Sequence, residues 1–135
     1  MGFSVSASTA IIFAGMFLAV GTLYPAVSNG YERVTDAEVD RNDAQLDMRN
    51  TNVEIGSINK TSITVNNTGS TSLTVSEVNL VVNGEYITSY DTNVDGASDT
   101  DLWLPGESLK IDKFGGGADR IKVVTDNGIS VTGVV

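Results

Sequence analysis

An acidic segment between residues 91 and 101 carries the oxygen atoms whose spacing comes closest to metal chemistry. Its ligand-type side chains are Asp91, Asn93, Asp95, Asp99 and Asp101. Alternate oxygen ligands followed by a glycine, here Gly96, are typical of the opening of a calcium-binding loop. Position twelve is Leu102 instead of a bidentate glutamate, so the segment is not an EF-hand. Two interpretations stay open: a looser cation site, or a solvated acidic loop.

Two residue types that most enzymes use are absent. The 135 residues include no histidine and no cysteine. Their absence removes Ser-His and Cys-His nucleophiles, ordinary zinc sites and the usual general base near neutral pH. A pair of catalytic carboxylates of the glycosidase kind would need a cleft lined by aromatic residues, and the chain has one tryptophan. We therefore predict a protein that is not an enzyme and uses no cofactor.

The charges are unevenly distributed along the chain. All 8 basic and 17 acidic side chains follow Tyr31, and the formal net charge is −9. Binding to nucleic acid or to an anionic lipid surface would need clusters of Lys and Arg, so we expect no nucleic-acid partner. An acidic surface stays soluble in concentrated salt, where repulsion between carboxylates is screened, and this favours a halophilic source.

The uncharged N-terminal part predicts a single membrane-spanning helix. Val5 to Val27 exceeds the roughly 20 apolar residues that cross a bilayer. No basic residue precedes this run, which argues against a cleaved secretory signal. Pro25 is expected to kink the helix near the outer interface. The acidic remainder is expected outside the cytoplasmic membrane, in the cell envelope.

Small residues in the predicted span allow close packing of helices. Ala10 and Ala14 form one pair at four-residue spacing, and Gly15 and Ala19 form another. Such pairs favour helix association, although small residues are also common in membrane helices generally. A homodimer or hetero-oligomer is expected.

The helix is predicted to continue outward as a stalk to Arg49. A narrow stripe at alternating spacings of three and four residues consists of Val34, Ala37, Arg41, Ala44 and Met48. The stripe fits either a solvated linker helix or a seam against a partner helix. Residues 1–49 are thus expected to form span and stalk, and residues 50–135 a separate domain.

The domain after Asn50 is predicted to be an immunoglobulin-like antiparallel β-sandwich. Seven short strands are indicated by alternating apolar residues at 53–55, 63–65, 73–75, 78–82, 109–111, 121–123 and 129–131. Turn signals such as Asn83-Gly84 separate them. A slip in the alternation predicts a β-bulge at Ser76-Glu77, and Trp103 is expected to fill one end of the core.

Two Asn-x-Thr sequons lie in the predicted β domain. They are Asn59-Lys60-Thr61 and Asn66-Asn67-Thr68. Because glycosylation of such sequons occurs on exported chains, Asn59 and Asn66 are candidate glycan sites and agree with an external β domain.

The N-terminal motifs and the layout together resemble a known family. The opening Met1-Gly2-Phe3-Ser4-Val5-Ser6, the apolar run Ile11-Ile12-Phe13-Ala14-Gly15 and the segment Glu32-Arg33-Val34 are similar to the archaeal flagellar family FlaF/FlaG, and closer to FlaF. The resemblance implies a stator part of the archaellum motor, anchored in the cytoplasmic membrane among its lipids. It also implies a β-sandwich that binds the surface-layer (S-layer) protein, and a FlaG-type stator partner.

The main alternative is a filament subunit of the type IV pilin or archaellin kind. Those proteins share the plan of a long apolar helix and a β head. Their signal is expected to carry Lys or Arg just before the cleavage site, and no basic residue precedes Gly2. A filament subunit must also leave the bilayer and bury its helix among copies of itself. The sequence therefore favours a protein that stays in the membrane.

Overall fold

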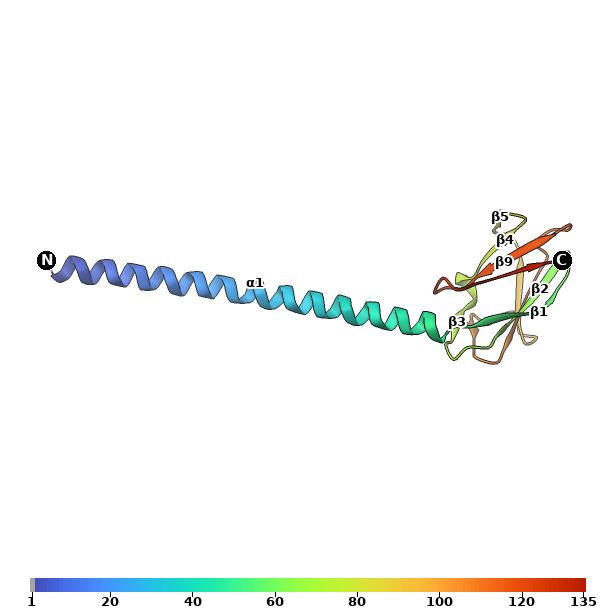
Figure 1. The fold of residues 1–135 in the computed structure, drawn as a ribbon, viewed down its shortest axis with the longest axis horizontal. Helices are drawn as coiled ribbons and strands as arrows, with labels where there is room; N and C mark the ends of the chain where they lie inside the picture. Colours follow the sequence, from blue (N-terminus) through green and yellow to red (C-terminus); the bar gives the residue numbers. More distant parts are fainter. Residues whose placement is uncertain (1) are drawn as a thin grey trace. The chain divides into compact units, whose positions relative to one another are not determined.

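The computed structural model describes residues 2–135, which divide into two compact units. One unit ends at Asn42, and the other comprises Asp43–Val135. The first is helical throughout, and the second contains the end of the helix and all of the strands (Figure 1).

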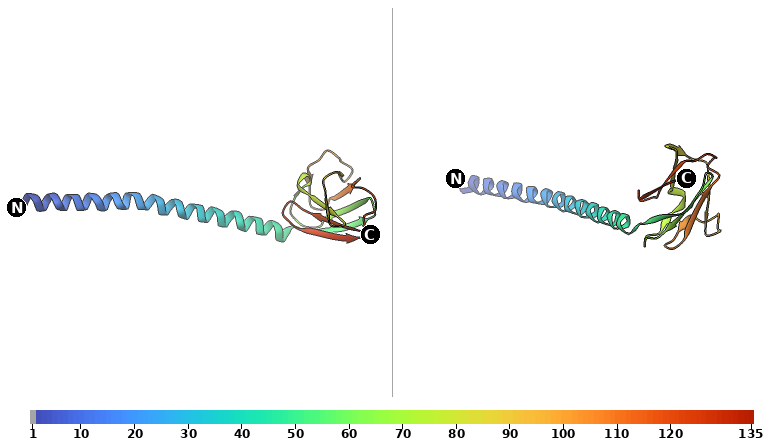
Figure 2. Two further views of the ribbon diagram at one scale, coloured as in Figure 1. Left: turned by 90° about the horizontal axis from the view of Figure 1, so that it is seen from above. Right: turned by 45° about the vertical axis from the view of Figure 1, so that its right-hand side comes forward.

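The long α-helix, α1, spans Gly2–Asn50. Pro25 lies inside it without ending it, and the ribbon of α1 is continuous (Figure 2). Hydroxyl groups in the apolar part donate to carbonyl oxygens one turn back, as in the 2.9 Å bond from Thr9 Oγ1 to Val5 O, which satisfies them without a partner chain. None of the helical residues described is buried, and one stretch of 18 residues is strongly apolar with no more than two charged side chains. In length and composition α1 is able to cross a membrane.

The β domain consists of two four-stranded antiparallel sheets and one short pair. The sheet orders are β1-β2-β8-β6 and β10-β9-β4-β5, and β3 pairs with β7. The elements are β1 (Val53–Ile58), β2 (Ser62–Asn67), β3 (Leu73–Thr74), the 3₁₀ helix η1 (Val75–Glu77), β4 (Asn79–Val82), β5 (Glu85–Ile87), β6 (Asp91–Val94), β7 (Leu102–Trp103), β8 (Ser108–Asp112), β9 (Arg120–Val124) and β10 (Ser130–Val134). This division of strands between two sheets is the immunoglobulin arrangement. The predicted fold class, a long N-terminal helix followed by an antiparallel β-sandwich, is confirmed.

The core lies between the two sheets and is formed by alternate residues of the long strands. Ile63 and Val65 of β2 face Ile121 and Val123 of β9 in the same buried cluster, and all four are exposed by 1 % or less. Trp103 is also fully buried, and its indole N–H donates to Glu107 O at 2.9 Å. The prediction that Trp103 lies in the core is confirmed. In a small domain without disulfides, a lone tryptophan contributes a large share of the buried apolar area.

Three strands and one irregularity differ from the expectation. Strands β5, β6 and β7 were not predicted, because they are short and their residues do not alternate between apolar and polar. The prediction of a β-bulge at Ser76-Glu77 is wrong, because the chain forms the 3₁₀ helix η1 there instead. One turn of 3₁₀ helix reverses the phase of the side chains, so Val75 and Val78 both reach the core.

The last turn of α1 is tied to the β domain by backbone contacts. Asp47 O accepts hydrogen bonds from Thr51 N at 2.9 Å and from Thr51 Oγ1 at 2.6 Å. Asn50 O accepts a bond from Ser70 N at 2.9 Å. These bonds satisfy carbonyl groups that a helix end leaves without partners. The compact β unit accordingly includes the end of the helix from Asp43 onward.

Candidate interaction surface

The outer face of the β10-β9-β4-β5 sheet combines apolar and basic residues. Because Ile121 and Val123 point into the core, Arg120, Lys122 and Val124 point outward. Residues paired across neighbouring strands point to the same side of a sheet. One such outward-pointing row consists of Thr132, Lys122, Val81 and Tyr86. We call this surface the GFC face, because β10, β9 and β4 occupy the places of strands G, F and C in an immunoglobulin domain. Its residues are Asn79, Val81, Tyr86, Arg120, Lys122, Val124, Ser130, Thr132 and Val134.

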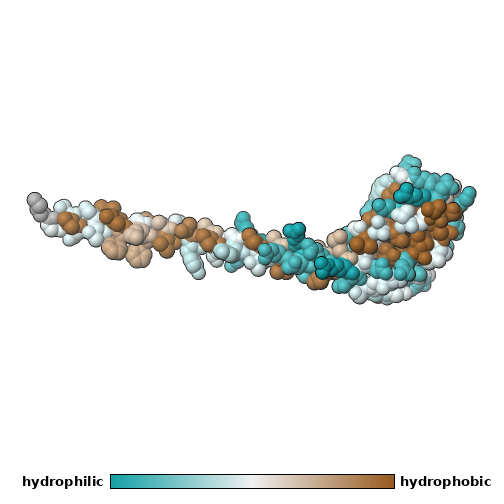
Figure 3. All heavy atoms as spheres, in the orientation of Figure 1, coloured by the Kyte–Doolittle hydropathy of each residue, from teal (hydrophilic) through white to brown (hydrophobic). Residues whose placement is uncertain are grey.

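The GFC face is suited to protein contact. Tyr86 is 57 % exposed and Val134 is 73 % exposed. The Tyr86 hydroxyl donates to Asn79 Oδ1 at 2.8 Å, which fixes the position of the ring. In the orientation of Figure 3, apolar residues gather on one side of the β domain. An exposed aromatic ring and an exposed valine on one sheet face, with basic residues between the two edge strands, are typical of a recognition surface.

The GFC face differs in the sign of its charge from the rest of the chain. None of its nine positions is a carboxylate, although the chain carries a net charge of −9. Neither Arg120 nor Lys122 forms an ion pair within residues 2–135. Both cations are therefore available to a partner, and the partner that fits them has an acidic surface.

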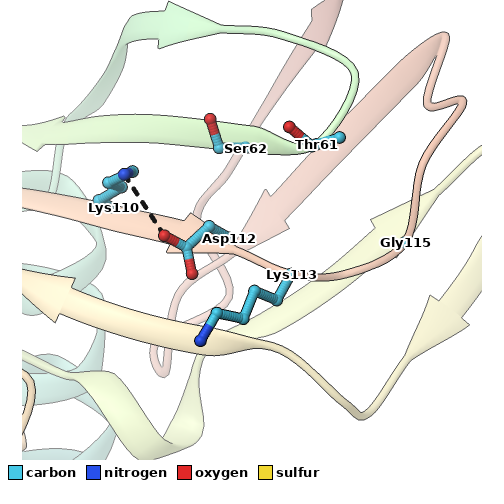
Figure 4. Close-up of a pocket in the computed structure, with 6 residues that line it drawn as sticks. All are labelled: Thr61, Ser62, Lys110, Asp112, Lys113 and Gly115. Carbon is cyan, nitrogen blue, oxygen red and sulfur yellow. Dashed lines mark ion pairs between the residues drawn. The ribbon is translucent and has the colours of Figure 1, made fainter.

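The opposite sheet presents a polar outer face. A shallow pocket on this side is lined by Lys110, Asp112 and Lys113 (Figure 4). Thr61, Ser62 and Gly115 complete its lining. Lys110 Nζ lies 3.4 Å from Asp112 Oδ2, and Lys113 Nζ lies 2.5 Å from Asp91 Oδ2. The hydrogen bond and the negative charge of Asp91 raise the pKa of Lys113. These cations already have partners, and no apolar side chain accompanies them in the pocket.

Tyr90 lies at the edge between the sheets and is held by the fold. Its hydroxyl donates to Val78 O at 2.7 Å. Burial, with a smaller contribution from Tyr86, raises the pKa of Tyr90. The phenol therefore stays neutral and serves as a hydrogen-bond donor.

The structure gives most of the residues in the predicted cation loop other contacts. Asn93 Oδ1 accepts from Gly96 N at 2.6 Å, and Asp95 Oδ1 accepts from Ser108 N at 3.1 Å. Asp101 binds Ser76 N at 2.7 Å and Ser76 Oγ at 3.0 Å, while Asp91 pairs with Lys113. Within residues 2–135, no group of three or more His, Cys, Asp or Glu side chains is arranged to hold a metal ion. A cation site involving Asp99 and the other four residues stays a prediction from sequence.

The two sequons occupy different environments. Asn59 is exposed at the turn between β1 and β2, where its Oδ1 accepts bonds from Thr61 N at 3.0 Å and Ser62 N at 2.8 Å. Asn66 is half-buried within β2, and its Oδ1 accepts from Ser108 Oγ at 2.7 Å. Its amide nitrogen also packs closely over Gly56, where an added Cβ would lie only 3.1 Å away.

We predict that Asn59, and not Asn66, carries a glycan when the chain is exported in its own host. A glycan on the Asn66 nitrogen would have to displace the contact with Gly56, whereas the Asn59 turn is open to solvent. Asn59→Gln should remove one glycan from the intact mass, and Asn66→Gln should leave the mass otherwise unchanged. Loss of a glycan in Asn66→Gln alone would contradict this prediction.

The predicted helix-packing residues all lie on the open surface of α1. Ala10, Ala14, Gly15 and Ala19 are exposed, and an added Cβ on Gly15 would meet nothing within 4 Å. Their part in helix association stays a prediction. The GFC face was missed by the sequence analysis, although the alternation of Arg120 and Lys122 with buried residues was a signal for it.

The fold defines a class of protein in which a long exposed apolar helix precedes an immunoglobulin-like β-sandwich. No protein-family model and no curated protein matches the chain. Among solved structures it is similar to the archaellum periplasmic stator protein FlaG from Sulfolobus acidocaldarius, at 17 % identity over 63 % of this chain and 99 % of that one, with a TM-score of 0.40. It is also similar to the archaellum periplasmic stator protein complex FlaF and FlaG from the same organism, at 19 % identity over 62 % of this chain and 84 % of that one, with a TM-score of 0.38.

Proposed function

We propose that the protein is a non-enzymatic, membrane-anchored stator component of the archaellum motor. In this proposal α1 holds the chain in the cytoplasmic membrane as a single span. The β domain lies outside the membrane and binds the S-layer protein through the GFC face. A rotary motor needs a part fixed to the cell envelope, and a protein joined to both the membrane and the S-layer would supply it.

The observation that carries the proposal is the GFC face. An anchor needs one permanent binding surface and no catalytic group, and the β domain offers an apolar and basic face on an otherwise acidic chain. The length and hydropathy of α1 support the anchor. The resemblance of the N-terminal motifs to the FlaF/FlaG family supports the motor and a FlaG-type partner.

Binding of the S-layer protein is tested with the full-length chain in detergent micelles or nanodiscs at high salt. We predict saturable binding that weakens at least about tenfold in the double variant Arg120→Glu/Lys122→Glu, because two contact cations would become repulsive charges. The matched control is Lys110→Glu/Lys113→Glu, which changes the net charge equally on the opposite sheet. Interferometry on immobilised S-layer protein measures both affinities.

Two outcomes would contradict the proposal. If the two double variants lose affinity equally, the effect is one of net charge and the GFC face is not the contact surface. If neither the S-layer protein nor a FlaG-type protein binds the unmodified chain, the stator function fails.

The alternative is a filament subunit related to type IV pilins and archaellins. The exposed apolar surface of α1 favours it, since a filament would bury that surface among many copies. A filament subunit should dominate the protein recovered from sheared filaments. A stator component should stay with the membrane fraction in few copies.

A further inference from the structure

A regular heptad pattern runs along α1 from the apolar part into the charged part. Residues at alternating spacings of three and four are Phe13, Met16, Val20, Leu23, Val27, Gly30, Val34, Ala37, Arg41, Ala44 and Met48. All but Arg41 are apolar or small. A pattern with a mean period of 3.5 residues is typical of two helices that wrap around one another. We call these residues the seam.

The seam has the surface relief that knobs-into-holes packing requires. Phe13, Met16 and Val20, together with Phe17, line one hollow on the helix surface. Val27, Gly30 and Val34, together with Tyr31, line a second hollow. The second hollow has no side chain at Gly30, where an added Cβ would meet nothing within 4 Å. Gly30 and Ala37 occupy successive equivalent heptad positions, so a second backbone can approach closely there.

The seam stays uncovered beyond the predicted span. Val34 is 58 % exposed, and Met48 is 45 % exposed. Lipid cannot shield these side chains where the helix carries Glu32, Arg33 and Asp36, because charged residues are expelled from the bilayer. In water an apolar stripe of this kind is stabilised by burial against another helix.

The charged residues that flank the seam favour a second copy of the same helix as the partner. In a parallel pair of identical helices, a residue flanking the seam faces the residue five positions later on the other copy. Arg33 therefore faces Glu38, and Asp40 faces Gln45, across the interface. Neither Arg33 nor Glu38 forms an ion pair within residues 2–135. Arg41, at a central seam position, lies beside Asp40 of the second copy, and a charged residue there specifies one register.

We propose that a second copy of this chain covers the seam and that the two helices form a parallel, in-register coiled coil. The parallel orientation rests on the proposed membrane anchor, because two copies inserted with the same topology point the same way. The pair presents two β domains to one lattice, which strengthens attachment through multivalency. S-layer binding itself is not needed for the helices to pair.

Single cysteines test the seam in a chain that has no cysteine of its own. Full-length variants Val34→Cys and Ala37→Cys are placed in vesicles without S-layer protein and oxidised mildly. In a parallel, in-register pair, equivalent seam positions approach within the range of a disulfide, about 4.4–6.8 Å between Cα atoms. We expect at least about tenfold more covalent dimer than for Thr35→Cys or Val39→Cys, which lie off the seam. Equal cross-linking at all four positions, or a maximum at Val39, would overturn the proposal.

Charge exchange gives an independent test of the partner and its orientation. Arg33→Glu and Glu38→Arg should each reduce energy transfer between labelled copies in vesicles, because like charges would then face each other. The double variant Arg33→Glu/Glu38→Arg should restore it. A double variant as weak as the single variants would rule out the parallel pair. Extraction of the same vesicles with carbonate shows separately whether the chain is anchored, so failure of the anchor is distinguished from failure of pairing.

Discussion

Trp103→Ala is expected to lower the free energy of unfolding of the β domain by about 3–5 kcal/mol, the largest effect of any single replacement proposed for this protein. Trp103 is fully buried in the shared core of both sheets. Its removal leaves a cavity and also leaves Glu107 O without the 2.9 Å bond from the indole nitrogen. A domain of this size has a total stability of only about 5–15 kcal/mol, so much of it would be lost.

Urea denaturation of the full-length chain in detergent, followed by the circular dichroism of the β-sheets, measures the change. Leu102→Ala is the matched control, because Leu102 precedes Trp103 in β7 but is 51 % exposed. The control should change stability by less than about 1 kcal/mol. Equal losses in the two variants would show that β7, and not the buried indole, is the sensitive feature.

Gly69→Ala is expected to cost about 3 kcal/mol, because there is no room for a methyl group. A Cβ at Gly69 would lie 2.4 Å from Asn50 O and 2.5 Å from Asn52 N. Both are backbone atoms, one in the last residue of α1 and one just after it, so a side-chain rotation cannot relieve the contact. The amide groups of Thr68 and Gly69 both donate to Asn52 O, at 2.9 and 3.0 Å, and these bonds would lengthen.

Gly116→Ala provides the control for this clash. Gly116 has an ordinary φ, and an added Cβ there would meet nothing within 4 Å. Its replacement should be neutral or slightly stabilising, because alanine restricts the unfolded chain. The same urea titration compares the variants, and equal midpoints for Gly69→Ala and Gly116→Ala would contradict the close approach.

The Gly69 contact also bears on how the proposed anchor would transmit force. The loop containing Gly69 and Ser70 holds the end of the helix through Asn50 O, and Thr51 continues the attachment through Asp47 O. If the β domain binds the S-layer and the helix is fixed in the membrane, tension passes through the covalent chain between Asn50 and Val53, and these hydrogen bonds stiffen that junction.

The sequence by itself determined the division into helix and β domain and the identity of the main core strands. The uncharged run before Glu32 and the alternation in residues such as Ile63 and Val65 are local signals, because burial of one face imposes a period on neighbouring residues. The immunoglobulin-like class followed from the number and spacing of such runs. The burial of Trp103 followed from its size.

The tertiary structure alone decided the short strands, the phase change at η1 and the surface that is free to bind. Strand β6 forms because Asp91 to Val94 pair with the edge of β8, a partner distant in sequence. The GFC face exists because β10, β9, β4 and β5 lie side by side, which places Tyr86 near Lys122 although they are far apart in the chain. Asp101 accepts a bond from Ser76 N and Asp91 pairs with Lys113, although the sequence had grouped the two carboxylates in one loop. Long-range contacts leave no periodic trace in the sequence, so the local pattern determined the elements, and their packing determined the candidate site.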